Sequence, residues 1–363
     1  MTERVTTELM PVAVYRAPGE VAVEQRAVPT PGPGQLLVEV SHCGVCGSDI
    51  HLMVEGWGRP GLVGGHEFTG TVVAVGEGVS DWHAGDQVVG GPSPRCGHCR
   101  RCLEGKPSQC EQRRGQIDVH LDNGAFARYV LVRAESAFEV PQKLSLREAA
   151  LTEPLAVALH GITRSGLSPG DSAMVFGAGP IGALSIAALV AKGIGPVVAV
   201  EPGERRRELA LRLGASEALD PAALEHFERW EPERIAERAV DAVLECSGKK
   251  GAMELALYQL RRGGRLVLVG AGMEAPSFDP NRLLLNELEI VGSFVYDADG
   301  FDRALELLAS RSIPTDLLIE PEDVTLDHLT GALGELVSGK LAGKVMVVPR
   351  VSTDVHELEE DGR

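Results

Sequence analysis

Hydrophobic and polar positions divide the chain into two kinds of region. From about residue 11 to 133, short apolar runs such as LLVEV and ARYVLV are separated by Gly and Pro, which is typical of closely turned β-strands. From about residue 153 to 294, apolar strands such as SAMVFG alternate with helical patterns such as RRRELALRLG. The remainder, about 298–349, contains one clear helix and a closing strand, KVMVVP. The pattern predicts an α/β protein with a β-rich region and a doubly wound parallel sheet.

Composition excludes several classes of protein. The 363 residues are enough for two domains at roughly 100–200 residues each. A net charge of −17 disfavours binding to nucleic acid and to anionic membrane surfaces. The longest apolar stretch, around residues 183–191, is much shorter than the roughly 20 residues of a membrane helix. We therefore expect a cytoplasmic protein with no nucleic-acid or membrane partner.

A glycine-rich turn follows the first strand of the predicted parallel sheet. SAMVFG leads into GAGPIG and then into a predicted helix, which is the context that a dinucleotide-binding turn requires. In such a turn the glycines permit a tight bend, close approach of a pyrophosphate, and packing of helix on strand. The alternative is a turn that is rich in glycine for packing alone. The expected cofactor-binding residues here are Gly177, Gly179, Pro180, Ile181 and Gly182.

Glu201 ends the next predicted strand and bears on the choice of cofactor. An acidic side chain at this place can accept hydrogen bonds from the adenine ribose and repel a 2′-phosphate, which favours NAD over NADP. The arginines at 205–207 leave NADP as the alternative, because they could hold a 2′-phosphate. Ligands of open sheets bind at the carboxyl ends of strands, so residues just after the later strands are further candidates to bind the cofactor. These candidates are Ser247, Val269 and Ser293, and Arg206 of the arginine run is a further cofactor candidate.

Four cysteines form the pattern C-x2-C-x2-C-x7-C. Such spacing can place four thiolates around one tetrahedral zinc ion with no position left for water, so we expect a structural zinc site. An iron–sulfur cluster is the alternative, and a disulfide framework is disfavoured in a chain of this length. The four cysteines are Cys96, Cys99, Cys102 and Cys110.

A second set of metal-binding residue types is dispersed along the chain. Cys46 lies in GVCGSDIH, His66 and Glu67 lie in GGHEFTG, and Glu153 lies in LTEPLAVALHG. A thiolate, an imidazole and a carboxylate suit a zinc ion that keeps one position open for substrate. No spacing rule requires this set, and taken singly each residue also has an ordinary structural interpretation.

Taken in order, these motifs resemble the zinc-containing medium-chain alcohol dehydrogenases, and more closely their polyol and secondary-alcohol branch, which includes sorbitol and butanediol dehydrogenases. The resemblance extends over about residues 12–348 and ends in GKVMVV. It implies a GroES-like catalytic domain at 1–155 and 298–363, with a structural zinc lobe at 93–115. A Rossmann domain is implied at 156–297. We also expect two zinc ions per chain and a homodimer or homotetramer.

The resemblance also implies roles for single residues. Cys46 and His66 correspond to ligands of a catalytic zinc, and Asp49 to a residue that orients the His66 ring. Glu153 stands where the simplest alcohol dehydrogenases have a second Cys. The third ligand therefore stays open between Glu67 and Glu153, either of which could bind directly or through water.

The implied reaction is the transfer of hydride between a secondary alcohol or polyol, a small-molecule substrate, and NAD, with zinc favouring the alkoxide form of the alcohol. Ser48 and His51 resemble the two ends of a proton relay, with relay through water as the alternative. Trp57 and Phe294 are candidates to line the substrate pocket. The competing activities are a threonine or formaldehyde dehydrogenase-like reaction on the same scaffold, or a non-catalytic cofactor-binding protein.

Overall fold

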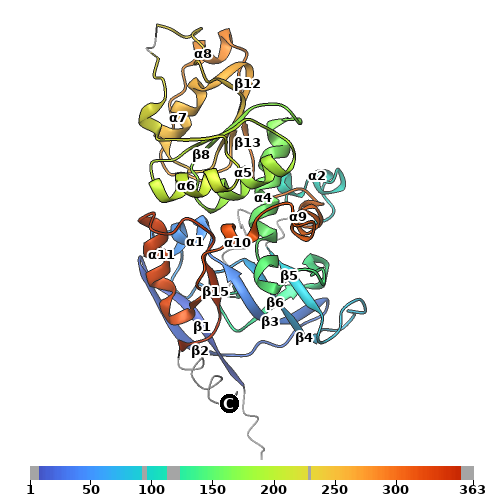
Figure 1. The fold of residues 1–363 in the computed structure, drawn as a ribbon. Coiled ribbons are helices and arrows are strands. Elements are labelled where there is room, and N and C mark those ends of the chain that lie inside the picture. Colours follow the sequence, from blue (N-terminus) through green and yellow to red (C-terminus); the bar gives the residue numbers. More distant parts are fainter. Residues whose placement is uncertain (1–7, 92–95, 113–122, 228–229, 353–363) are drawn as a thin grey trace, which may run out of the picture. The chain divides into compact units, whose positions relative to one another are not determined.

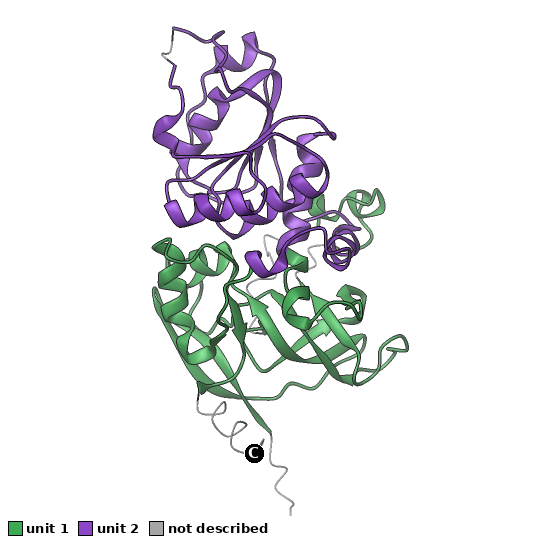
Figure 2. Ribbon diagram, in the orientation of Figure 1, with its two compact units in different colours: residues 1–153, 319–363 green, residues 154–318 purple. Residues whose placement is uncertain are grey.

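The described chain forms two compact units. A computed structural model describes residues 8–91, 96–112, 123–227 and 230–352. Unit 1 comprises Met1–Glu153 and Ile319–Arg363, and unit 2 comprises Pro154–Leu318 (Figure 2). Unit 1 passes into unit 2 after Glu153, two residues before the expected boundary at 155. Unit 2 passes back into unit 1 after Leu318, whereas the expected boundary was at 297, so residues 298–318 belong to unit 2.

Unit 1 is built on a mostly antiparallel sheet. The strand order is β14-β15-β3-β4-β5-β7, with β6 also paired to β3, while β1 and β2 form a separate antiparallel pair. The closing strand β15 pairs with β3, so that Met346 lies opposite Gly44 (Figure 1). Both ends of the chain thus complete one sheet. The strands are β1 Leu9–Ala17, β2 Glu20–Ala27, β3 Gln35–Gly44, β4 Glu67–Val75, β5 Gln87–Gly90, β6 Tyr129–Arg133, β7 Ala137–Glu139, β14 Val324–Thr325 and β15 Met346–Val348.

Short helices join these strands and cover their apolar side. Leu329 and Leu333 of α11 belong to the same buried core as Leu36 and Val38 of β3, so the C-terminal segment helps to form this core. The helices of unit 1 are α1 Gly47–Met53, α2 Arg100–Leu103, η1 Pro107–Gln109, η3 Ala134–Ser136, α3 Leu146–Ala149, η5 Leu326–His328 and α11 Leu329–Val337.

Unit 2 contains a parallel sheet in the order β10-β9-β8-β11-β12-β13. This is the order of a dinucleotide-binding fold made of two mononucleotide-binding halves, with β8 and β11 meeting where the strand order reverses. Its inner strands are almost wholly apolar and buried, as expected when helices cover both faces. The predicted fold class is therefore confirmed. The strands are β8 Ala173–Phe176, β9 Val197–Val200, β10 Glu217–Leu219, β11 Val240–Glu245, β12 Leu260–Leu268 and β13 Glu289–Gly292.

Helix α5, Pro180–Ala191, follows the glycine-rich turn and is mostly buried between its neighbours. It begins at Pro180, whose ring suits the first helical position because the missing N–H has no partner there in any case. None of the described helices is long and apolar enough to cross a bilayer. Besides α5, the helices of unit 2 are α4 Thr152–Ser165, which begins at the unit boundary, α6 Glu204–Arg212, η4 Pro221–Ala223, α7 Lys250–Tyr258, α8 Pro280–Leu285, α9 Gly300–Ala309 and α10 Thr315–Leu318.

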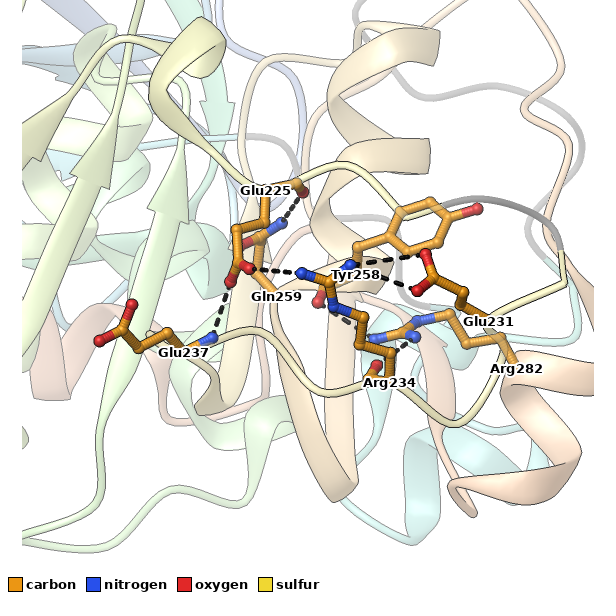
Figure 3. Close-up of polar contacts among 7 residues, drawn as sticks. All are labelled: Glu225, Glu231, Arg234, Glu237, Tyr258, Gln259 and Arg282. Atoms are coloured by element: carbon orange, nitrogen blue, oxygen red, sulfur yellow. Dashed lines mark hydrogen bonds and ion pairs between the residues drawn. The ribbon is translucent and has the colours of Figure 1, made fainter.

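A fully buried arginine, Arg282 of α8, organises the loop before β11 (Figure 3). Its guanidinium donates to the carbonyl oxygens of Arg234 at 2.8 Å and Tyr258 at 3.1 Å, and also to those of Leu257 and Pro232. Its Cζ lies 4.8 Å from the centre of the Tyr258 ring. Backbone acceptors and a π-face therefore surround this buried cation.

Candidate active site

The four predicted cysteines of unit 1 converge. Their sulfur atoms all lie within 4.8 Å of one another, as ligands of a single tetrahedral ion must. Cys96 Sγ accepts a hydrogen bond from the Cys99 N–H at 3.3 Å. Backbone hydrogen bonds lower the pKa of Cys99 to about 6, which favours the thiolate that metals bind. Residues 93–95 and 113–115 of the predicted lobe lie outside the described residues.

A second group consists of Cys46, His66 and Glu67, whose ligand atoms also lie within 4.8 Å of one another. Cys46 is the N-cap of α1, and Glu67 begins β4 directly after His66. Burial, together with the nearby Glu67 charge, raises the pKa of Cys46 to about 12. A thiol and a carboxylate crowded together in a buried place are compatible with a divalent cation, which would stabilise the deprotonated forms of both.

Asp49 fixes the backbone on both sides of this group. Its side chain is fully buried. Oδ2 accepts the Cys46 N–H at 2.9 Å, and Oδ1 accepts the Gly65 N–H at 3.3 Å. The His66 Nδ1 lies 3.9 Å from Oδ1, too far for a direct hydrogen bond. Asp49 thus acts first on the backbone positions of the two ligand segments, and only weakly on the His66 ring.

Lys344 neutralises Glu67. Both side chains are buried, and Lys344 Nζ lies 2.8 Å from Oε1, to which it donates a hydrogen bond, and 2.8 Å from Oε2. The same Nζ donates to the Val45 carbonyl at 3.1 Å. A Cβ at Gly44 would lie 2.2 Å from Glu67 Oε2, so only glycine leaves room for this carboxylate. Sequence reasoning missed Lys344, although it lies in the GKVMVV motif.

Glu153 is buried in the first turn of α4 but does not belong to the group of three. Burial raises its pKa to about 8, and the His66 charge opposes that shift. Glu67, Cys46 and Lys344 also act on it electrostatically, so Glu153 lies in the same electrostatic environment as the group. Glu67 thus belongs to the set whose ligand atoms are mutually within 4.8 Å, and Glu153 does not.

The two predicted relay residues lie on α1. Ser48 Oγ is buried and has no hydrogen-bond partner among the described residues. His51 Nδ1 is 2.8 Å from Glu55 Oε2, and its ring is stacked on Trp57 with the centroids 4.6 Å apart. Trp57, a predicted pocket residue, therefore packs on a predicted relay residue. Glu55 was missed, although an acid four residues after a helical histidine is a recognisable pairing signal.

A cavity of about 480 Å³ in unit 1 adjoins His66. Small-molecule sites have volumes of roughly 300–1,000 Å³. Its lining includes the apolar side chains of Met10, Val12 and Phe68. The Ser136 hydroxyl, which also lines it, is buried without a partner among the described residues. Space beside the metal-ligand group is therefore present within unit 1.

In unit 2 the glycine-rich turn has the geometry that its sequence predicts. Gly177 has φ +81°, which strongly favours glycine, and a Cβ there would lie 2.8 Å from the Cβ of Ser247. A Cβ on Gly182 would lie 1.8 Å from the Gly177 oxygen. The helix N-terminus that begins after Gly179 provides N–H groups that suit a phosphate.

Glu201 is engaged by the backbone around it. Its Oε2 accepts the Ala178 N–H at 2.8 Å, and its Oε1 accepts the Gly203 N–H at 2.9 Å. Each carboxylate oxygen has a second lone pair with which it could accept a ribose hydroxyl. Arg207 donates to the Glu201 carbonyl at 2.8 Å, whereas Arg206 lies near Gly179, 3.9 Å from a Cβ built there. Of these two arginines, Arg206 is therefore the one beside the turn.

The remaining cofactor candidates follow strands β11, β12 and β13. Ser247 is held by Glu245, whose Oε1 accepts the Ser247 N–H at 2.8 Å. Sequence reasoning missed Glu245. A Cβ on Gly161 would lie 3.1 Å from a Val269 methyl and 4.0 Å from Ser293 Oγ, so both candidates lie beside α4. Ser293 Oγ is buried and lacks a partner among the described residues.

Comparison with known proteins identifies the family. Residues 32–142 match the profile of the alcohol dehydrogenase GroES-like domain, and residues 180–310 match that of the zinc-binding dehydrogenases. The chain is 33% identical to sorbitol dehydrogenase of Bacillus subtilis, over 94% of this chain and 97% of the relative. The chain therefore belongs to the zinc-binding, medium-chain alcohol dehydrogenase family, as its motifs predicted.

Solved structures agree with this assignment. The 2R,3R-butanediol dehydrogenase of Bacillus subtilis has a TM-score of 0.82 and 32% identity, covering 94% of this chain and 100% of that one. A zinc-binding dehydrogenase from Sinorhizobium meliloti, solved with NADP, has the same TM-score, identity and coverage. The relatives named here as sorbitol and butanediol dehydrogenases act on polyols and secondary alcohols, which confirms the predicted branch.

Proposed function

We propose that the protein is a zinc-dependent dehydrogenase that transfers hydride between a polyol or secondary alcohol and NAD. The observation that carries the proposal is the convergence of Cys46, His66 and the buried Glu67, whose ligand atoms lie within 4.8 Å of one another. The buried Ser48 Oγ lies two residues from Cys46 and acts on its thiol. The named relatives, sorbitol and butanediol dehydrogenases, supply the substrate class.

Thiolate, imidazole and carboxylate donors form a ligand set that zinc accepts. When bound, zinc would act as a Lewis acid that lowers the pKa of an alcohol hydroxyl. Cys46 and His66 would hold the ion, with Glu67 or Glu153 as the third donor. Lys344 Nζ, 2.8 Å from Glu67 Oε2, would balance the negative charge of this buried carboxylate. The four cysteines of the lobe would hold a second, structural zinc.

The residues of α1 would move the proton. Ser48 Oγ would accept the hydroxyl proton of the alcohol while giving up its own hydroxyl proton along the path toward His51, since this oxygen is buried close to Cys46. His51 would release the proton to solvent, with Glu55 holding its Nδ1. This arrangement supports general acid–base catalysis by Ser48 and His51, with the two residues at opposite ends of the path.

NAD is the proposed cofactor, with the domain at 154–318 binding it. Glu201 supports this choice, because a buried carboxylate beside the turn would repel a 2′-phosphate. Arg206 beside Gly179 and the NADP-bound relative are the observations that favour NADP. The ratio of kcat/KM for NAD to that for NADP decides between the two.

We also propose that the protein is a homo-oligomer. Strand β13 is one of the two edges of the sheet in unit 2, and the side that pairs with no other described strand offers backbone groups to a second copy. Met273 and Leu284 of the same unit are 70% and 72% exposed. Light scattering of the purified protein tests this part, and a monomer at micromolar concentration would contradict it.

Zinc content tests the metal assignment independently of turnover. Wild-type protein should contain two zinc ions per chain. Cys46→Ser should lose one ion and nearly all turnover while it still binds NADH, whereas Cys99→Ser should lose the other ion and stability. Full zinc content and near-normal turnover in Cys46→Ser would remove Cys46 from the metal site.

A further inference from the structure

The segment after β13 has an unfavourable backbone conformation that nothing in the sequence motifs explains. Val295 has φ +48°, in the left-handed region that β-branched residues rarely adopt. Such conformations persist only where surrounding contacts hold them, and they concentrate at functional sites. The contacts that hold this segment are therefore informative.

Two contacts fix the residues immediately after Val295. The Tyr296 side chain is buried and packs edge-to-face on Phe301, with the ring centroids 5.0 Å apart. His160 Nδ1 of α4 lies 3.0 Å from Asp297 Oδ2. His160 is only 6% exposed, whereas the Asp297 side chain is 26% exposed, so a largely buried imidazole anchors the loop.

The segment also begins at a place where ligands bind. Ser293 follows the last strand of the second half of the sheet, at its carboxyl end. The first half carries the glycine-rich turn and Glu201, which suit the adenine nucleotide. The second half of the sheet is therefore the part that would contact the nicotinamide nucleotide. The next residue of α4 after His160, Gly161, lies against both Val269 and Ser293, so the anchor and the expected contact residues meet on one helix.

We propose that His160 and Asp297 are positioning residues that hold the segment 293–299 in the conformation that receives the nicotinamide half of the cofactor. This inference rests on the proposed function, because it requires a dinucleotide to bind unit 2. The pair does not touch the reacting atoms in this account. It acts through Ser293 and the strained Val295, whose conformation it maintains.

Binding measurements separate this role from a general structural one. The variants are His160→Ala and Asp297→Ala, with His160→Gln and Asp297→Asn as conservative replacements that retain a polar side chain at each place. Asp302→Ala is the matched control, since Asp302 is an exposed acid of the neighbouring helix α9 and lies outside the segment. Each protein is titrated with NADH or NADPH, whichever wild type binds more tightly. Each is also titrated with the same nucleotide lacking nicotinamide, ADP-ribose or its 2′-phosphate.

Both alanine variants should weaken binding of the reduced dinucleotide about tenfold, which is the order expected for loss of one charge-assisted hydrogen bond. The same variants should weaken binding of the ADP-ribose ligand less than about twofold. The conservative variants should lie between, and the double alanine variant should be no weaker than the single ones because both break the same pair. The Asp302 control should resemble wild type.

Two results would overturn the inference. Equal weakening for both ligands would mean a general structural role, and unchanged binding for all variants would mean that the pair positions nothing. If His160→Ala fails to fold, Asp297→Asn and His160→Gln carry the same comparison. A wild-type protein that binds neither ligand would instead refute the proposed function itself, and this inference with it.

Discussion

The ion pair between Lys344 and Glu67 allows a quantitative test of the metal-ligand group. Replacing Lys344 by Met keeps an apolar side chain but removes the ammonium that lies 2.8 Å from the Glu67 carboxylate. The Glu67 side chain is fully buried. At that distance two unit charges interact by about 6 kcal/mol with an effective dielectric constant of about 20. Desolvation of both groups offsets part of this attraction. Breaking such a pair by removing one partner typically costs about 3–5 kcal/mol.

Lys344→Met should therefore lower the free energy of unfolding by about 3–5 kcal/mol, measured by urea denaturation of zinc-free protein. Adding Glu67→Gln to this variant should restore most of the loss, because a neutral amide no longer requires a cation. The exposed Lys340→Met is the matched control and should change stability by less than about 0.5 kcal/mol. A loss below about 1 kcal/mol, or no recovery in the double variant, would refute the reasoning.

Three further predictions concern other parts of the molecule. Burial raises the pKa of Glu153 from 4.5 to about 8, so between these pH values the folded state keeps a proton that the unfolded chain has lost. The stability of zinc-free protein should therefore fall as pH rises from 4.5 to about 8. Glu153→Gln should flatten that dependence in pH-resolved denaturation, and an unchanged slope would assign it to another group. Arg282→Met should cost more than about 3 kcal/mol, measured by thermal unfolding, because it leaves buried carbonyls without donors; a loss near zero would show that water replaces the guanidinium. Glu201→Ala should shift kcat/KM from NAD toward NADP and loosen the turn at Ala178, whereas an unchanged cofactor ratio would mean that another group sets the preference.

Local motifs were predictable because their geometry follows from short-range constraints. The four cysteines are close in sequence, so their convergence needs only one small lobe. The glycine-rich turn is equally local, since Gly177 needs positive φ and Gly182 needs close contact with the Gly177 carbonyl. The alternation of strands and helices likewise indicated a parallel sheet before its order was known.

Pairings made by distant segments could not be predicted in this way. Lys344 lies 277 residues after Glu67 and reaches it only because β15 completes the sheet beside β3. The second change of unit, after Leu318, depends on contacts of the same kind. An amphipathic pattern shows that α9 has an apolar face, but only tertiary contacts with α4, such as Arg303 donating to Thr163 Oγ1 at 3.4 Å, show which unit the helix joins.

Glu201 shows the same limit at a single residue. Its place after β9 predicted contact with a ribose, and the structure shows both of its oxygens already accepting backbone N–H groups, from Ala178 and Gly203. The sequence shows that an acidic residue follows the strand, whereas the turns around that residue decide which groups it binds. Its influence on cofactor choice therefore stays a prediction for measurement.

The most direct test of the central proposal is the reduction of NAD by zinc-loaded protein, followed through the absorbance of NADH. Sorbitol, xylitol, 2,3-butanediol, simple primary and secondary alcohols, and threonine are the substrates to compare. The account predicts turnover with a polyol or secondary alcohol, with NAD preferred over NADP, and its loss in Cys46→Ser. Turnover of threonine alone, or of wild type and Cys46→Ser alike, would contradict it.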